Sequence, residues 1–312
     1  MKPQITTANK GPILTKSTFK NYDLCINPYV GCQFGCKYCY VRFFVKDPKK
    51  EWGEFVRLRE HIEDKLPKEL HLAAGRRVVI GTMTDPYQPA ERTHRLTRRV
   101  LELLKTSHVS KVGIFTRSPI VAEDLDLIKE LPRARVHFTI TPYTREILEK
   151  LEPIAVSTKR RFDTVRLIKA AGIRAQVNVS PVLPKLSDQF TEEFAKTISE
   201  IGVDEFHVDP MQAYGESFRA TKEALAGTPD WPAIEEMLLD STKYQVWKDQ
   251  YRDSWFKAWK KYGNPDALPV WMDHAKKVMI DMSTGKDLDH RRYGDDTWDY
   301  KRMFGYCGLP LA

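Results

Sequence analysis

Short apolar and β-branched runs alternate with amphipathic segments along the first two thirds of the chain. Between the runs, apolar residues recur at helical spacing over residues 92–105, 122–131, 160–171 and 191–201. The alternation predicts parallel strands that are joined by helices and buried on both faces. The six runs with the composition of strands span residues 23–27, 77–83, 111–117, 135–141, 173–181 and 205–210.

The lengths of these segments limit the architecture. A strand–helix unit needs about thirty residues, so six units fill residues 20–212. A closed barrel of eight units needs about 250 residues and two further strands, for which the sequence gives no signal. We therefore predict an α/β fold with a partial, open (β/α)6 barrel over residues 21–212, preceded by an N-terminal extension over residues 1–20.

The pattern changes after Met211, where six of the seven tryptophans lie. An aromatic stripe at helical spacing is more typical of a buried helix face than of a cofactor site. The sequence therefore predicts a helical, Trp- and Tyr-rich C-terminal cap over residues 213–312 that packs on the partial barrel. The residues of the stripe are Tyr244, Trp247, Tyr251, Trp255, Trp259 and Tyr262.

Charge and composition limit the cellular location and the partners that we expect. The first twenty residues lack the apolar run of a signal peptide and no apolar run reaches the length of a membrane span, so we expect a cytoplasmic protein with no membrane partner. The net charge of +8 arises before Met211, because the last 102 residues hold 15 Lys and Arg against 16 Asp and Glu. Basic clusters at residues 92–99 and 159–161 are either solvated faces or a surface for a polyanion, so nucleic acid is a candidate partner.

Three of the five cysteines lie together in the stretch NPYVGCQFGCKYCYVR, as Cys32, Cys36 and Cys39. Such clustering without a secretion signal points to metal rather than to disulfides. Three thiolates at this spacing each bind one iron of a [4Fe–4S] cubane and leave the fourth iron open. An open iron suits the amino and carboxylate groups of a methionine moiety, which predicts a cluster with a chemical role.

A structural zinc site is the alternative for these cysteines. Zinc needs four closed ligands, usually as two separated pairs, and no second pair or intervening histidine exists between Cys25 and Glu60. The remaining two cysteines are too few for a second cluster, so we predict one. Cys25 is expected to be a small buried residue of the first strand. Cys307 is a candidate hydrogen donor if the cap folds over the barrel, with an inert packed cysteine as the alternative.

The cysteine motif resembles the signature of the radical S-adenosylmethionine (SAM) superfamily, C-x3-C-x-aromatic-C after the first strand, with Tyr38 as the aromatic residue. Within the superfamily the chain resembles the spore photoproduct lyase branch. This resemblance rests on the cysteine stretch, GTMTDPYQPAE, an EP followed eight residues later by Arg161, and SPVLPKLSD. It implies one [4Fe–4S] cluster, bound SAM, an external electron donor of the flavodoxin or ferredoxin type, and hydrogen abstraction by a 5′-deoxyadenosyl radical.

The same resemblance implies a set of SAM-contacting residues at the strand ends. A zwitterionic cofactor needs acceptors for its ammonium and donors for its carboxylate and ribose, and these side chains supply both. Each has a structural alternative as a strand-end cap or core contact, and only one of the two threonines at 139 and 141 is expected to touch SAM. The set comprises Tyr38, Tyr40, Thr84, Asp85, Arg117, Thr139 and Thr141.

One departure from the lyase branch bears on the reaction. Thr82 stands where the lyases carry a cysteine that returns a hydrogen atom to the product. A hydroxyl O–H bond is too strong for that role, so repair of thymine dimers by that route is not expected. Three hypotheses follow: an enzyme acting on a nucleobase in nucleic acid or nucleotide, an enzyme acting on a small molecule or peptide in biosynthesis, and a non-catalytic nucleic-acid-binding module holding a cluster or zinc.

Overall fold

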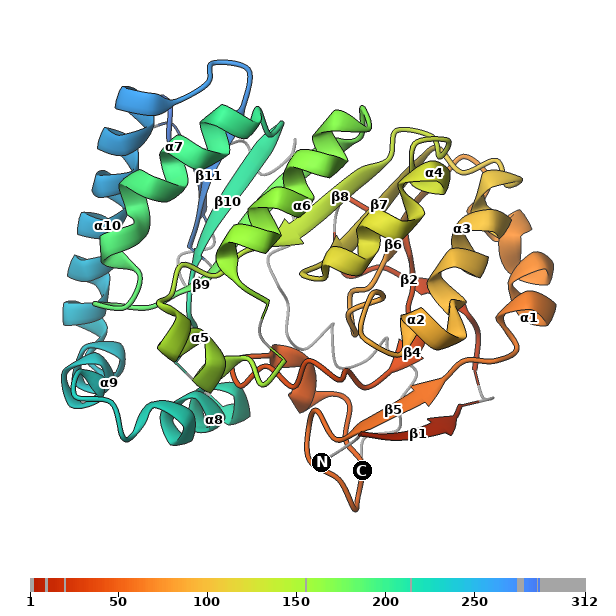
Figure 1. The fold of residues 1–312 in the computed structure, drawn as a ribbon, viewed down its shortest axis with the longest axis horizontal. Coiled ribbons are helices and arrows are strands. Elements are labelled where there is room, and N and C mark those ends of the chain that lie inside the picture. The colour runs from red at the N-terminus through yellow and green to blue at the C-terminus, as the bar shows by residue number, and fades with distance from the viewer. Residues whose placement is uncertain are drawn as a thin grey trace.

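The computed structural model describes residues 3–8, 11–19, 21–154, 156–213, 215–273, 278–284 and 286. Within this part of the chain, two β-sheets and a layer of helices form the fold (Figure 1). The larger sheet contains nine strands and the smaller one contains three.

The bounds of the elements are as follows. The large sheet is built from β2 (Leu14–Lys16), β3 (Leu24–Ile26), β6 (Arg77–Ile80), β7 (Lys111–Thr116), β8 (Arg135–Thr139), β9 (Arg174–Val182), β10 (Glu205–Pro210), β11 (Leu268–Asp273) and β12 (Val278–Asp281). The small sheet is built from β1 (Gln4–Thr7), β4 (Tyr29–Val30) and β5 (Phe55–Leu58). The helices are α1 (Ile62–Glu69), α2 (Glu91–His94), α3 (Leu96–Lys105), α4 (Leu125–Ile128), α5 (Arg145–Leu151), α6 (Thr158–Ala170), α7 (Thr191–Ile201), α8 (Gly215–Leu225), α9 (Trp231–Leu239) and α10 (Ser241–Tyr262).

The large sheet is parallel except at its two edges. Its spatial order is β12-β11-β10-β9-β8-β7-β6-β3-β2, and only β2 and β12 run antiparallel to their neighbours. Among the described residues these two edge strands do not pair with each other, so the barrel that the sheet forms is open, as predicted. The N-terminal strands β2 and β1 extend the large and the small sheet, respectively.

The six predicted strands correspond to β3 and β6 to β10, but the sheet continues further. Strand β11 pairs in parallel with β10 and is a seventh parallel strand, followed by β12. Both lie in the segment whose pattern predicted only helices. The reason is local: Pro269 interrupts the short apolar run of β11, and proline weakens a strand signal.

Two of the predicted helices are broken. The one over residues 92–105 divides at Arg95, whose φ of 50° is left-handed, into α2 and α3. The carboxylate of Glu91 accepts hydrogen bonds from the backbone N–H groups of Thr97 (3.0 Å) and Arg98 (3.1 Å). It thereby satisfies donors at the start of α3 that a continuous helix would have used. The one over residues 122–131 is a 3₁₀ turn followed by the single turn of α4.

Helices cover one face of the large sheet. Helices α1, α3, α4, α6, α7 and α10 follow one another across this face (Figure 1). The strands direct alternate apolar side chains such as Val136, Phe138 and Phe206 beneath these helices, where all three are fully buried. The aromatic stripe of α10 joins the same core, as predicted, with the half-buried Tyr244 packed against it and Tyr262 outside it.

Helices α5 and α8 lie beside the loop that contains the cysteines. Figure 1 shows both helices at the lower left, next to the red-orange segment. Helix α8 contacts the turn Tyr40–Phe43, and Lys46 pairs with Glu216 at 2.9 Å. The C-terminal part of the chain therefore packs directly against the cysteine loop.

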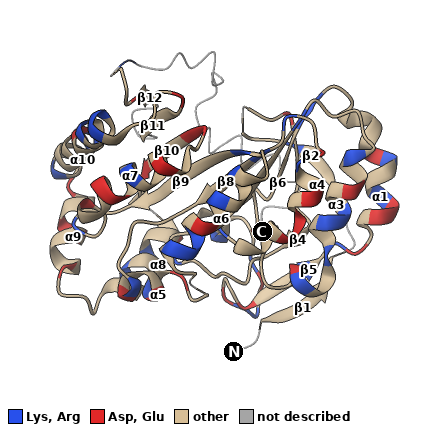
Figure 2. Cartoon of the chain, turned by 45° about the horizontal axis from the view of Figure 1, so that its top comes forward, with Lys and Arg blue, Asp and Glu red and all other residues tan. Residues whose placement is uncertain are grey.

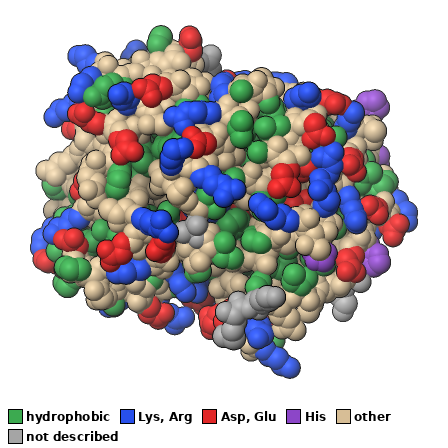
Figure 3. Space-filling model, viewed as in Figure 1, with side chains coloured by type: hydrophobic (Ala, Val, Ile, Leu, Met, Phe, Trp, Pro, Cys, Tyr) green, Lys and Arg blue, Asp and Glu red, His purple; other side chains and the backbone are tan. Residues whose placement is uncertain are grey.

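Charges of both signs are mixed on the surface. Lys, Arg, Asp and Glu positions alternate along the outer helices (Figure 2), and the helical face carries both signs without one continuous basic band over its described residues (Figure 3). Several residues of opposite charge are neighbours on one helix. For example, Lys159 Nζ lies 2.8 Å from Asp163 Oδ2. None of the described helices combines the length and apolar character that a bilayer crossing requires.

Replacement of Trp255 by alanine tests the role of the aromatic stripe. Trp255 is fully buried and its ring lies 5.4 Å from that of Phe206. We expect Trp255→Ala to lower the free energy of unfolding by about 3–5 kcal/mol, measured by urea titration, because it leaves a large cavity. Val246→Ala, on the same helix but half-exposed to solvent, should change it by less than about 0.5 kcal/mol. Equal effects of the two substitutions would show that the stripe is not core.

Candidate functional site

The cysteine loop, residues 31–39, follows β4 and forms two successive turns. The N–H of Gly35 donates to the carbonyl of Cys32 at 3.3 Å, and the N–H of Cys39 donates to that of Cys36 at 3.2 Å. Gly31 has a φ of +86°, and a Cβ at that position would lie 2.5 Å from the carbonyl oxygen of Phe55. The tight path of the loop over β5 therefore requires glycine at this position.

The three thiols of the loop lie in one apolar environment. Cys32 and Cys36 are buried and Cys39 is half-buried, and all three belong to a cluster that includes Phe34, Trp52 and other apolar side chains. Burial raises the pKa of the Cys36 thiol to about 12, although the Arg117 guanidinium acts in the opposite direction. Thiolates in this environment need a cationic partner, and iron supplies one.

The donor set fits a cubane better than a single ion. Within the part of the chain that the structure describes, no three Cys, His, Asp or Glu side chains converge as ligands of one ion. A cubane needs no such convergence, because each thiolate binds a different iron. Three soft thiols on one loop are the ligands that iron–sulfur clusters use.

The turn after β6, residues 81–90 (the β6 turn), holds the cysteine loop in place through hydrogen bonds. The side chain of Gln88 accepts a hydrogen bond from the N–H of Gln33 (2.8 Å) and donates to Thr84 Oγ1 (3.0 Å). The Gln33 side chain accepts from the N–H of Ala90 at 2.5 Å, and Thr84 Oγ1 donates to the carbonyl of Gly31 at 2.6 Å. These reciprocal bonds explain why the stretch GTMTDPYQPAE accompanies the cysteine motif, and the sequence analysis missed both glutamines.

Asp85 and Tyr40 also make structural hydrogen bonds. The carboxylate of Asp85 accepts from Thr116 Oγ1 at 2.7 Å and from the N–H of Arg117 at 2.9 Å, which ties the β6 turn to the end of β7. The hydroxyl of Tyr40 donates to the carbonyl of Thr82 at 2.6 Å. The predicted SAM contacts at Thr84, Asp85 and Tyr40 thus lie around the loop, and all three side chains have protein partners.

Tyr38, Arg117 and Thr141 meet around a buried carboxylate that the sequence analysis left without a role. Glu152, just after α5, accepts hydrogen bonds from Arg117 Nη1 and Thr141 Oγ1, both at 3.0 Å, and from the hydroxyl of Tyr38. Arg161 of α6 pairs with the same carboxylate, and both side chains are buried. Burial alone would raise the pKa of Glu152, but the Arg161 and Arg117 guanidiniums outweigh it and lower the pKa to about 2.

The remaining predicted residues lie apart from this network. Thr139 is half-buried on β8, opposite Asn178 of β9, and it does not reach the Glu152 network in which Thr141 takes part. Cys25 is buried on β3, where its sulfur lies 3.0 Å from Thr15 Oγ1. Cys307 lies outside the described residues.

The inner face of the sheet, opposite the helices, carries polar side chains on β8, β9 and β10, whereas Cys25, Val79 and Phe115 keep it apolar on β3, β6 and β7. Strand register places His137, Gln176 and Glu205 in one row across three strands. The next row, toward the carboxyl ends of the strands, contains Thr139, Asn178 and His207. A strict alternation in RVHFT, AQVNVS and EFHVDP carried this signal in the sequence.

These two rows form a polar inner wall that is partly open to solvent. The wall consists of His137, Thr139, Gln176, Asn178, Glu205 and His207. His207 and Asn178 are half-buried, and His207 Nε2 lies 2.5 Å from Glu205 Oε1. His137 is buried and stacks on Phe115 with ring centroids 4.2 Å apart, and its Nδ1 has no hydrogen-bond partner among the described residues. Such a wall offers donors, acceptors and an aromatic ring to a ligand inside the partial barrel.

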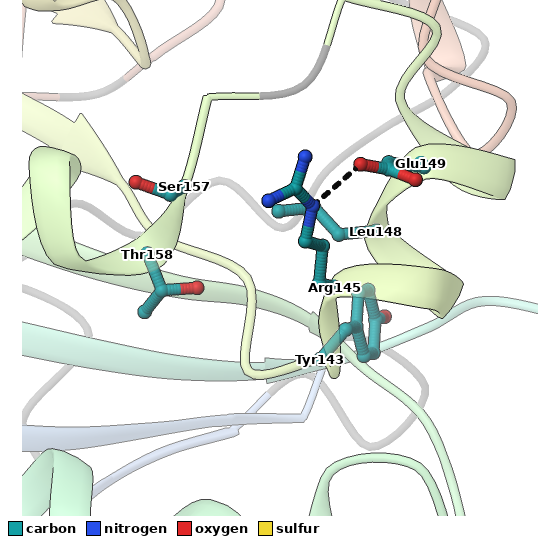
Figure 4. A pocket seen from close by; sticks show the side chains of 6 residues that line it. All are labelled: Tyr143, Arg145, Leu148, Glu149, Ser157 and Thr158. Atoms are coloured by element: carbon teal, nitrogen blue, oxygen red, sulfur yellow. Dashed lines mark hydrogen bonds and ion pairs between the residues drawn. The ribbon is translucent and has the colours of Figure 1, made fainter.

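A separate pocket of about 310 Å³ lies at the starts of α5 and α6 (Figure 4). Its lining includes Tyr143, Arg145 and Ser157. Arg145 already pairs with Glu149 at 2.8 Å, and Ser157 caps α6 by accepting from the N–H of Arg160. None of the predicted site residues lines this pocket.

Comparison with known families decides the identity of the fold. The family sequence model of the radical SAM superfamily matches residues 26–201, which include the cysteine loop, the β6 turn and the Glu152 network. The chain belongs to the radical SAM superfamily. As a radical SAM protein it uses one [4Fe–4S] cluster and SAM, and enzymes of this superfamily need an external reductant.

The radical SAM chain has relatives of similar sequence in an archaeon and in mycobacteria. It is 32% identical over 164 residues to uncharacterized protein MJ0683 of Methanocaldococcus jannaschii, a match that covers 52% of this chain and 61% of that protein. It is 30% identical over 172 residues to uncharacterized protein Rv2578c of Mycobacterium tuberculosis, covering 52% of this chain and 50% of the relative. The matched region thus spans between half and two thirds of these proteins.

Solved structures show the same fold for this radical SAM protein. A spore photoproduct lyase mutant with bound AdoMet and dinucleoside spore photoproduct superposes with a TM-score of 0.65 at 15% identity, covering 85% of this chain and 81% of the lyase. The lyase complexed with dinucleoside spore photoproduct gives a TM-score of 0.65 at 14% identity, covering 86% and 82%. At this identity the match establishes the fold alone.

Substitution of Gly31 tests whether the loop path governs cluster assembly. Gly31→Ala places a Cβ against the Phe55 carbonyl and should reduce the iron bound per chain by at least half after anaerobic reconstitution. Gly75→Ala is the matched control, because Gly75 also has a positive φ (+69°) but nothing lies within 4 Å of its Cβ position. It should keep the wild-type iron content despite a similar backbone cost of about 1–2 kcal/mol. Loss of iron in both variants would point to backbone strain alone.

Proposed function

We propose that Cys32, Cys36 and Cys39 bind the [4Fe–4S] cluster, and that the chain is an enzyme that removes a hydrogen atom from a polar substrate inside the partial barrel. The observation that carries this proposal is the buried three-thiol loop, fastened by the β6 turn beside the carboxyl ends of the parallel strands. Ligands of such folds gather at this end of the strands. The polar inner wall extends from the same end.

When bound, the cluster and SAM supply the one-electron cleavage of the C5′–S bond that yields a 5′-deoxyadenosyl radical. The chain's own residues shape the site in which this happens. Tyr38, held by Glu152 and by an Arg117 guanidinium 5.4 Å from its ring centroid, offers an aromatic surface beside the loop. The side chain of Thr139, at the end of β8, is half-buried and makes no hydrogen bond to another described residue, so among the predicted SAM contacts we favour Thr139.

A nucleobase-type substrate is the candidate that the inner wall supports best. The side chains of Gln176 and Asn178 are amides, which match the N–H and C=O edges of a base, and they bond each other at 2.8 Å. The stacked rings of Phe115 and His137 add an aromatic surface. The lyase structures of the same fold hold a dinucleoside photoproduct, which supports a related substrate here.

A small molecule or peptide substrate is the second candidate, and the surface charge favours it. Nucleic-acid backbones are normally held by a basic stripe, whereas the helical face of this protein mixes both signs (Figure 3). A free nucleoside or a small polar metabolite needs the inner wall alone. For the reductant we propose a small acidic electron carrier of the flavodoxin or ferredoxin type.

Single cysteine variants test the ligand assignment. Cys32→Ala, Cys36→Ala and Cys39→Ala should each lose most of the iron and release no 5′-deoxyadenosine with dithionite and SAM, because a cubane held by two thiolates is labile. Cys25→Ala is the control and should keep both iron and SAM cleavage. If the three variants cleaved SAM at the wild-type rate, or if the purified protein held zinc instead of iron, the assignment would be wrong.

Deuterium transfer tests the substrate class. Deuterated nucleosides, oligonucleotides and small polar metabolites are each incubated with the reduced enzyme and SAM, and deuterium in 5′-deoxyadenosine is measured by mass spectrometry. We expect transfer from a nucleoside, reduced at least tenfold in Asn178→Leu but not in the surface variant Arg145→Met. Transfer only from oligonucleotides, with salt-sensitive binding, would favour nucleic acid, and transfer only from other metabolites would exclude the nucleobase.

A further inference from the structure

The buried network at Glu152 connects two charged groups to the cysteine loop. Arg117 Nη1 donates to Glu152 Oε1 at 3.0 Å and to the hydroxyl of Tyr38. Tyr38 stands between Cys36 and Cys39 in the sequence, so these contacts fix the guanidinium to the part of the loop that carries two of the three thiols. Only 16% of the Arg117 side chain is exposed, so little water screens its charge.

The partners of Arg117 account for its position. Glu152 is fully buried and accepts hydrogen bonds from four different side chains, those of Tyr38, Arg117, Thr141 and Arg161. Arg161, 1% exposed, donates to both oxygens of the carboxylate and neutralises it. A carboxylate held in this way cannot turn toward solvent, so it holds the Arg117 guanidinium in one place.

The contacts of Arg117 indicate a role other than the cofactor contact that the family resemblance implies. The Nη1 group already serves Tyr38 and Glu152, and the guanidinium carbon lies 5.4 Å from the Tyr38 ring centroid. These contacts direct the guanidinium toward the loop. A fixed positive charge beside thiolate ligands stabilises the more negative, reduced state of an iron–sulfur cluster.

We propose that Arg117 raises the reduction potential of the cluster through its charge, and that Glu152 and Arg161 are the positioning residues that hold it beside Cys36 and Cys39. This inference rests on the proposed function, because it requires that these cysteines bind the cluster. It assigns a role to the EP and Arg161 signature, which no predicted site residue explained. The cluster becomes easier to reduce when the cation is in place.

Midpoint potentials of the reconstituted protein, measured by EPR-monitored redox titration without substrate, test the proposal. Arg117→Met removes the cation and should shift the potential to more negative values, whereas Arg117→Lys keeps a charge and should shift it less. Glu152→Gln removes an anion but leaves an acceptor for Arg117, so it should shift the potential to more positive values. A purely structural role for the network gives no reason for shifts of opposite sign.

Arg145→Met is the matched control, because it removes the same charge from α5 at a side chain that is 89% exposed. Its potential should equal that of the wild type. If Arg117→Met also leaves the potential unchanged, or if it shifts the potential to more positive values, the proposal is overturned. Should Glu152→Gln not fold, the comparison of Arg117→Met, Arg117→Lys and Arg145→Met decides alone.

Two further readouts separate this inference from the others. The change that SAM causes in the EPR spectrum reports SAM binding: its loss in Arg117→Met at an unchanged potential would make Arg117 a cofactor ligand and overturn the tuning role. Failure of the wild-type chain to bind iron would instead contradict the proposed function itself. A wild type that binds iron and cleaves SAM, with no effect of Arg117 on the potential, contradicts only the inference.

Discussion

The burial of three thiols on one short loop is the constraint on which the rest of this structure depends. A buried thiol resists ionisation, and three adjacent thiolates repel one another, so the loop is chemically useful only when iron and neighbouring cations offset both effects. The fold provides these conditions by bringing the β6 turn, the end of β7 and the segment after α5 to the same place. Gln33 and Gln88 fix the backbone of the loop, and Arg117 supplies a cation.

The two faces of the large sheet differ in polarity. The helix-covered face is apolar and contains most of the core, including the aromatic residues of α10. The inner face of β8 to β10 presents polar side chains, of which Asn178 and His207 are half-buried, and full burial of such groups without partners would cost free energy. A parallel sheet with this asymmetry is typical of a barrel that receives a ligand rather than one that is filled by side chains. The same strands therefore supply both the core and the polar inner wall that we propose as the substrate site.

The C-terminal part of the chain joins these regions rather than standing apart from them. Helix α10 completes the core, β11 extends the parallel sheet, and α8 packs on the turn that follows the cysteine loop. A change in this part of the chain therefore acts on the site through direct packing. The helical face itself carries charges of both signs.

The sequence by itself determined the family, the cysteine loop and the order of strands and helices, because these depend on local spacing: C-x3-C-x2-C, glycines at Gly31 and Gly35, and apolar periodicity. Helix α7 and strand β10 fall on their predicted residues. Only the tertiary structure decided that Glu152 and Arg161 meet Tyr38, and that β11 joins the sheet. Contacts between residues 114 positions apart, such as Tyr38 and Glu152, leave no trace in local patterns, since they depend on how separate strand ends converge.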